Sequence, residues 1–269
     1  MCGGKIRDGK LSYQRTVTME NELKYQVVKS NHPLTEFVES FWLLQNQSDC
    51  TREVVVLPDG RVDMFFTRSA TGTFHIALLG IQTQPERASI APLRQTYAIS
   101  FNPLAVHYLF QTDIAHLVDK GTILPSSFWN FNADDLNDFD LFCEKATKKI
   151  HSMLPSEIDE RKRTLFNLIY SSKGAITIKE LAEKSFWSRQ QINRYFSQQF
   201  GVTAKAYCNI IRFRASFQHI KEGKLFPQRN FADQSHFIKE VKKLSGVSPK
   251  QLFKNRNERF IQFSTLNSE

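Results

Sequence analysis

Cysteine is scarce in this sequence, and the short motifs that mark the common enzyme classes are missing. The four cysteines lie far apart and form no C-x-x-C pair, which argues against a zinc site or a disulfide framework and for free thiols in a reducing cytoplasm. The seven histidines show no H-E-x-x-H spacing, and there is no G-x-S-x-G elbow, P-loop or dinucleotide fingerprint. We therefore predict that the protein is not an enzyme and needs no metal or cofactor.

Long apolar segments are missing as well. No window of 18 or more apolar residues exists, and the first ten residues lack the apolar core of a signal peptide. The sequence thus predicts a soluble cytoplasmic protein with no membrane partner. Residues 1–20 are polar and patternless, and we interpret them as a flexible tail.

Positive charge is abundant but unevenly placed. A chain of 269 residues with 41% hydrophobic content is long enough for two modest domains. Residues 173–269 hold 18 Lys and Arg against 7 Asp and Glu, a net of +11, whereas residues 1–172 hold 18 against 20, so that the total is +9. A basic surface in the last third is the phosphate-attracting footprint expected of a nucleic-acid-binding protein.

Residues 176–201 carry the signature of two short helices joined by a tight turn. Thr177 and Glu180 form a capping box at the start of the first helix. Ser188 and Gln191 repeat that arrangement at the start of the second helix, which Gly201 ends as a C-cap. This pattern is typical of a helix-turn-helix.

The outward face of the second helix is polar and basic. It is predicted to carry Arg189, Gln190, Asn193, Arg194 and Ser197. Such donors and acceptors reach base edges and phosphates when a helix lies in the major groove. We therefore predict that this helix binds DNA.

Helical patterns continue to the end of the chain. Thr203 can cap a long apolar helix, and Asp233 can cap a second one in which Phe237, Ile238, Val241 and Leu244 recur at helical spacing. Ser248 begins a last short helix. The chain is thus predicted to be all-helical from about residue 161.

Taken together, residues 176–256 resemble the two-part DNA-binding module of AraC/XylS transcription regulators. The matching residues are Leu181-Ala182, Ser188, Arg194-Tyr195-Phe196, Phe200-Gly201, Tyr207, Arg212, Ala215, Phe231-Ala232-Asp233-Gln234-Ser235-His236-Phe237 and Gly246-Val247-Ser248-Pro249. The resemblance implies two helix-turn-helix units that enter successive major-groove segments.

Carried onto this chain, the resemblance implies two reading helices. In the first, from Ser188 to Gln199, Gln190, Asn193 and Arg194 would face the bases, with Arg189 and Ser197 nearer the phosphates. The second, from Asp233 to Ser245, would present Gln234, Ser235, His236 and Lys239.

The second unit departs from the family pattern. Only Lys224 to Asn230 separate the linker from Phe231, and Pro227 disfavours a supporting helix there. We therefore expect a shortened second unit that reads bases weakly, while helix 188–199 does most of the reading. The alternative is that the second unit only positions the first one through phosphate contacts.

The first two-thirds of the chain look different. Residues 25–110 contain β-like runs broken by turn residues, and Pro58-Asp59-Gly60 predicts a hairpin over residues 54–66. Residues 113–151 and 157–172 look more helical. We predict an α+β protein with a β-rich domain at 21–155, a boundary near Pro155 and a DNA-binding domain at 156–262.

The β-rich part is similar to an uncharacterised domain found ahead of AraC-type modules. The matches are Pro33-Leu34 through Phe41-Trp42, Leu57-Pro58-Asp59-Gly60 with Asp63 and Phe65, Gly80 with Pro85, and Ser100-Phe101 with Pro103. The resemblance implies a sensor or dimerisation domain, for which a small barrel is one expectation. Trp42, Phe65, Phe66 and Phe101 fit either a core, which we favour, or an apolar effector pocket. Asp59 and Asp63 fit a polar effector site, although a role in the turn and hairpin explains Asp59 without an effector.

These observations predict a transcription regulator, with activation as the family habit and repression as the alternative. The expected partner is a double-stranded DNA operator; RNA polymerase, a small-molecule effector and a second copy of the chain are further candidates. The alternative is a ligand-binding or scaffold protein that binds nucleic acid without sequence preference. That alternative explains the basic surface but not the two capped helices with base-reading side chains.

Overall fold

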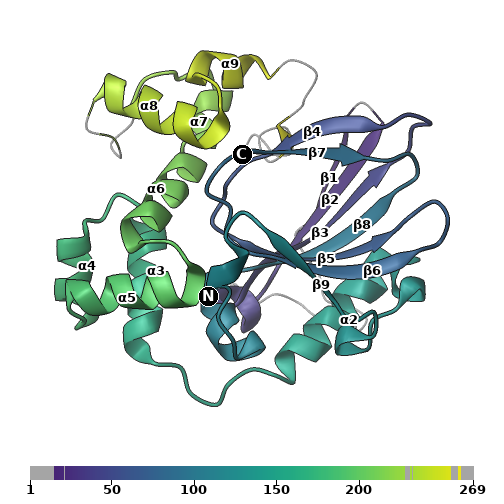
Figure 1. Ribbon diagram of the computed structural model, residues 1–269, viewed down its shortest axis with the longest axis horizontal. Helices are drawn as coiled ribbons and strands as arrows, with labels where there is room; N and C mark the ends of the chain where they lie inside the picture. Colours follow the sequence, from purple (N-terminus) through teal and green to yellow (C-terminus); the bar gives the residue numbers. More distant parts are fainter. Residues whose placement is uncertain (1–14, 21, 228–230, 232, 256–259, 262–269) are drawn as a thin grey trace, which may run out of the picture.

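The computed structural model describes residues 15–20, 22–227, 231, 233–255, 260 and 261. A β-sheet part comes first in the chain and helices follow it (Figure 1). The predicted α+β class and its order along the chain are therefore confirmed. A flexible tail is predicted for residues 1–20, of which residues 1–14 lie outside the described residues.

The sheet part is built from antiparallel strands. They are β1 (Arg15–Glu20), β2 (Leu23–Lys29), β3 (Val38–Asn46), β4 (Arg52–Val56), β5 (Val62–Arg68), β6 (Phe74–Leu79), β7 (Glu86–Ile90), β8 (Gln95–Phe101) and β9 (Gly121–Leu124). Seven form one sheet in the order β1-β2-β3-β8-β5-β6-β9, and β4 pairs with β7 separately. Among the described residues β1 and β9 are not paired with each other, so the large sheet is open and the barrel expectation is not met. Residues 15–20 belong to β1 and not to the tail.

The prediction of a hairpin over residues 54–66 is wrong. β4 pairs with β7, placing Val54 opposite Ala88, whereas β5 pairs with β6 and β8. Gly60 does adopt the left-handed conformation expected of the turn, with φ of +79°. The turn therefore carries the chain from one sheet to the other, because turn chemistry bends the backbone without choosing the strands' partners.

Helices cover one side of the sheet and form the carboxyl-terminal part. They are α1 (Pro103–Ala105), α2 (Phe139–His151), α3 (Glu160–Ser171), α4 (Ile178–Ser185), α5 (Arg189–Phe200), α6 (Ala204–Ala215), α7 (Phe217–Lys221), α8 (Gln234–Ser245) and α9 (Pro249–Lys254). Short turns complete the set: η1 (Leu34–Glu36), η2 (Val106–Phe110), η3 (Ala115–Leu117), η4 (Phe128–Asn130) and η5 (Ala133–Leu136). No helix in the described part of the chain has the length and apolar character needed to cross a membrane.

Two details differ from the expected helices. Residues 121–124, within a segment predicted to be helical, pair with β6 as β9. The long helix expected after Thr203 is divided at Ser216, whose hydroxyl donates to the carbonyl oxygen of Phe213 at 2.6 Å. Such side-chain bonds to the preceding turn compete with regular helical bonding.

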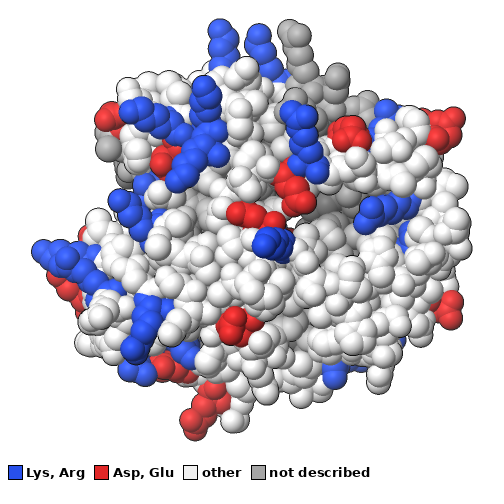
Figure 2. All heavy atoms as spheres, viewed as in Figure 1, with Lys and Arg blue, Asp and Glu red and all other residues white. Residues whose placement is uncertain are grey.

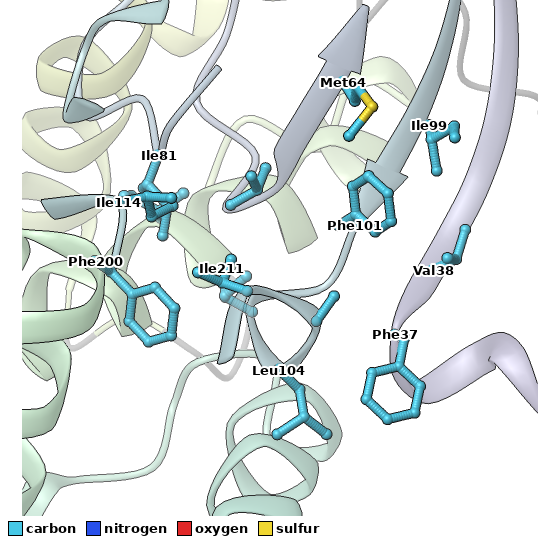
Figure 3. Close-up of a cluster of buried hydrophobic side chains, with 14 of the residues drawn as sticks. Phe37, Val38, Met64, Ile81, Ile99, Phe101, Leu104, Ile114, Phe200 and Ile211 are labelled. Carbon is cyan, nitrogen blue, oxygen red and sulfur yellow. The ribbon is translucent and has the colours of Figure 1, made fainter. Parts of the chain in front are cut away.

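One hydrophobic core runs through both parts (Figure 3). Met64, Ile99 and Phe101 enter it from the sheet, while Phe200 and Ile211 enter it from α5 and α6. Helices α5 and α6 are therefore packed onto the sheet part and are not tethered by a linker alone.

The four aromatic residues considered for a pocket divide between the two faces of the sheet. Phe66 and Phe101 are fully buried. Trp42 and Phe65 are half-buried on the opposite face, with ring centroids 5.2 Å apart. Phe66 and Phe101 therefore belong to the core, which is the interpretation that the sequence favoured over an effector pocket.

Candidate nucleic-acid interface

The α4–α5 pair has the helix ends that its sequence predicts. The Glu180 N–H donates to the Thr177 hydroxyl at 3.2 Å, and the Thr177 N–H donates to the Glu180 carboxylate at 2.9 Å. Ser188 and Gln191 form the equivalent pair, at 3.1 and 2.8 Å. Gly201 ends α5 with φ of +70°. Local capping chemistry therefore defines where both helices begin and where α5 ends.

The outward face of α5 consists of exposed polar side chains. Arg189, Gln190, Asn193, Arg194 and Ser197 are all exposed. Within the part of the chain that the structure describes, their side chains form no hydrogen bond or ion pair, so their polar groups are available to a partner. Figure 2 shows Lys and Arg side chains projecting from the helical part of the molecule, while much of the lower right of this view, over the sheet part, is uncharged.

The carboxyl end of α5 is docked on the sheet part. The Ile114 N–H donates to the Gln199 carbonyl oxygen at 2.9 Å, and the Gln199 side-chain amide donates to the Thr112 carbonyl oxygen at 2.6 Å. A Cβ at Gly201 would lie only 2.5 Å from the Ala115 carbonyl oxygen. The helix is thus held at its last turn while its first turns stay accessible.

A histidine reinforces this docking. One ring nitrogen of His107 lies 3.4 Å from the side-chain oxygen of Gln199, and the other lies 2.8 Å from the Lys162 ammonium. Burial, and then Lys162, lower the pKa of His107. A neutral ring that donates from Nδ1 to Gln199 and accepts from Lys162 at Nε2 satisfies both contacts. Gln199 is the last residue of the first predicted reading helix, and no sequence motif indicated that it has this structural role.

A chain of hydrogen bonds joins α3 and α6 to the turn before β5. The Tyr207 hydroxyl donates to the Gly60 carbonyl oxygen at 3.1 Å and lies 2.9 Å from the Tyr170 hydroxyl. Arg61 in turn approaches the Tyr170 oxygen at 3.4 Å. Because each tyrosine has one hydroxyl hydrogen, Tyr170 donates to Tyr207 and accepts from Arg61.

Glu39 of β3 forms ion pairs that join the sheet part to the helical part. Its carboxylate pairs with Arg61 from the turn and with Arg214 from α6. Burial by itself would raise the pKa of Glu39, but Arg214 and Arg61 outweigh it and hold the pKa well below the usual range. Glu39 therefore stays ionised and links the sheet to α6. No motif in the sequence singled it out, because Arg214 lies 175 positions away.

Asp59 and Asp63, the two candidates for a polar effector site, have different hydrogen-bond partners. Asp59 accepts from the Arg61 N–H at 3.0 Å, which fits the turn role. Asp63 accepts from the Ser100 hydroxyl, and Ser100 accepts from the Trp42 indole N–H at 3.0 Å. Burial, and then Asp59, raise the pKa of Asp63 to about 7.

Helix α8, which the sequence predicts to be the second reading helix, offers fewer free polar groups than α5. Its caps are as predicted: Asp233 accepts from the His236 N–H at 2.8 Å and Gly246 is left-handed. Ser235 and Lys239 are exposed. However, the Gln234 amide donates to the Leu225 carbonyl oxygen at 3.0 Å, and His236 is half-buried with its ring 5.9 Å from Phe231.

Two further features concern α8 and the residues that precede it. Ile238, one of the apolar residues that recur at helical spacing along α8, is 38% exposed. The described residues 222–227 between α7 and α8 contain no helix. The short helix α7 itself lies between α6 and α8, so the shortening of the second unit stays a prediction.

Comparisons with known proteins give limited matches. Residues 26–122 match a family described as a domain of unknown function, DUF6597. No curated protein matches the chain. Among solved structures, the chain is similar to a crystal structure of apo ToxT, a lysine-to-alanine variant from Vibrio cholerae strain SCE256. The identity is 14%, the TM-score is 0.38, and the match covers 92% of this chain and 98% of that one.

Proposed function

We propose that the protein is a sequence-specific DNA-binding transcription regulator of the AraC type, with activation as its mode of action. The observation that carries the proposal is the outward face of α5. Five exposed polar side chains there have no partner in the described protein, although both ends of the helix are rigidly defined. A helix that enters the major groove presents its first turns to the base edges, and these are the turns that the sheet part leaves uncovered.

The two reading helices are proposed to contribute unequally. On α5, Gln190, Asn193 and Arg194 are free to contact bases, whereas Gln234 and His236 on α8 are partly engaged with the protein itself. Ser235 and Lys239 remain for DNA. We therefore assign main base reading to α5, and to α8 a weaker role dominated by phosphate contact.

The β-rich part is proposed to regulate this activity, without catalysis. Its contact with α5 and α6 supports a role in sensing a small molecule or in self-association, because a change in the sheet part would be transmitted directly to the reading unit. RNA polymerase is the further protein partner that activation would require.

The second candidate function is a scaffold that binds nucleic acid without sequence preference. The net charge of +11 in residues 173–269 supports it. In this function the amides on the free face of α5 would contact phosphates alongside the cations and would read no base.

Selection of random duplex DNA by the full-length protein tests the proposal. The enriched pool would be sequenced, and binding of the selected duplex would be titrated across salt. Enrichment of one motif is expected. If nothing is enriched, and affinity for all duplexes falls by roughly 0.9 log units per log unit of salt for each phosphate contact, either an effector is required or the protein binds nucleic acid without sequence preference.

A further inference from the structure

The turn between α4 and α5 contains a residue that stability does not explain. Phe186 is the C-cap of α4 and has φ of +57° and ψ of +30°, the left-handed region. Residues other than glycine, and bulky ones above all, adopt this conformation at a cost. Glycine adopts this conformation without that cost and would therefore make the turn more stable.

The side chain of Phe186 is also exposed. With 86% of its surface accessible, it is the most exposed large hydrophobic residue in the described part of the chain. The adjacent Trp187 behaves differently, because its ring packs 5.2 Å from that of Tyr195 and beneath the guanidinium of Arg161. Trp187 therefore contributes to the fold, whereas the Phe186 ring makes no comparable ring contact with the described residues.

The surroundings of Phe186 are those of a nucleic-acid contact. Exposed Lys184 precedes it in the last turn of α4, and exposed Arg189 follows it in the first turn of α5. Ser188 lies between them as the cap of the helix proposed to read bases. An exposed aromatic ring between cations suits a polyanion that also offers apolar sugars and flat bases.

We infer that Phe186 is a DNA-contacting residue, whose ring packs against a deoxyribose and the adjoining base edge where the phosphates meet Lys184 and Arg189. The inference rests on the proposed function. It adds an apolar contact to the polar reading face of α5. Binding to DNA would bury the ring and so compensate for the unfavourable turn conformation in the free protein.

Phe186→Gly tests the inference, because it removes the ring and suits the left-handed turn. Binding of the selected duplex is expected to weaken about tenfold, while the melting temperature stays equal or rises. The matched control is Leu93→Gly, since Leu93 has φ of +56° and is 59% exposed in the turn between β7 and β8. Leu93→Gly should affect stability similarly and leave DNA binding unchanged.

A direct measurement accompanies the variants. Duplexes carrying 5-iododeoxyuridine at successive positions would be irradiated with the wild-type protein, and a crosslinked peptide with the adduct on Phe186 is expected. Unchanged or tighter binding by Phe186→Gly overturns the inference and leaves the proposed function intact. If the variant binds DNA normally but fails to activate RNA polymerase in vitro, the ring contacts protein and the inference is wrong. If the wild type selects no duplex, both the proposed function and this inference fail.

Discussion

The Tyr207 hydroxyl on α6 donates a hydrogen bond to the carbonyl oxygen of Gly60, at 3.1 Å, across 147 positions of sequence. Tyr207 is fully buried, and the side chain of Ile211 lies against the same turn. The turn at Gly60 thus serves two purposes, since it connects the two sheets and receives α6. Because the contact is buried and close-packed, we expect the sheet and the helices α3–α6 to unfold together.

Gly60→Ala should therefore destabilise the whole protein. A Cβ at Gly60 would lie 2.7 Å from Cδ1 of Ile211, and φ of +79° is itself unfavourable for alanine. We expect a loss of about 2–3 kcal/mol in the free energy of unfolding, measured by denaturant titration. Gly72→Ala is the control, because Gly72 has φ of +83° with open space around it, and should lose only about 1 kcal/mol. Equal losses would show that the approach of α6 is unimportant.

Glu39→Gln should weaken the attachment of α6. The substitution leaves Arg61 and Arg214 facing each other without the carboxylate that joins them. Because the pair is partly solvated, we expect a loss of about 2 kcal/mol in unfolding free energy, less than for a fully buried pair. Glu22→Gln removes the more exposed ion pair with Arg52 and should cost no more than about 1 kcal/mol. The prediction fails if the two variants are equally stable.

Asp63 should make stability depend on pH near neutrality. Its folded-state pKa, raised to about 7 by burial and Asp59, exceeds the ordinary value of 3.8, so the folded protein holds this proton more tightly. The stabilisation is present below about pH 4 and is lost as pH rises through about 7. Asp63→Asn should remove this contribution, so denaturant titrations at pH 5–8 should show the variant gaining relative to wild type as pH rises. A constant difference would contradict the assigned pKa.

His107 should act in the opposite direction. Burial and Lys162 lower its pKa below 6.5, so the folded protein favours the neutral ring. Its contribution to stability is present above the unfolded pKa and is lost as pH falls through the folded value. Amide exchange at Ile114, whose N–H donates to Gln199, should therefore accelerate under acid conditions, after correction for intrinsic exchange. In His107→Gln this acceleration should disappear; its persistence would assign the effect to another group.

Substitutions on α5 and α8 should affect DNA binding differently. Arg194→Ala should cost about 1–3 kcal/mol of binding free energy and relax sequence preference. Lys239→Ala should weaken binding to all duplexes and reduce the salt slope by about 1. Affinities for the selected and a scrambled duplex across salt distinguish the two. Equal losses of preference would contradict the unequal roles of the helices.

Local chemistry accounts for the predictions that succeeded. A cap needs only a side chain and the backbone a few residues away, so Thr177, Ser188, Asp233 and Ser248 could be identified as helix starts from sequence. The glycines that end α5 and α8 were predictable for the same reason. The exposed face of α5 followed from helical periodicity once its ends were known.

Non-local pairing accounts for the wrong hairpin prediction. The residues of β4 and β5 and the turn between them are those of a hairpin, yet β4 pairs with β7 and β5 with β6 and β8. The sequence could not show this, because partner choice depends on which apolar faces are buried together across the whole sheet.

Helix ends, the composition of the reading face and the basic charge of the last third were all encoded locally along the chain. Tertiary packing alone decided that the last turn of α5 docks near Ile114, that Glu39 joins Arg61 to Arg214, and that Gly60 receives Tyr207. These contacts join residues distant in sequence. They form because a buried polar group must find its partner wherever the packed core brings one within reach.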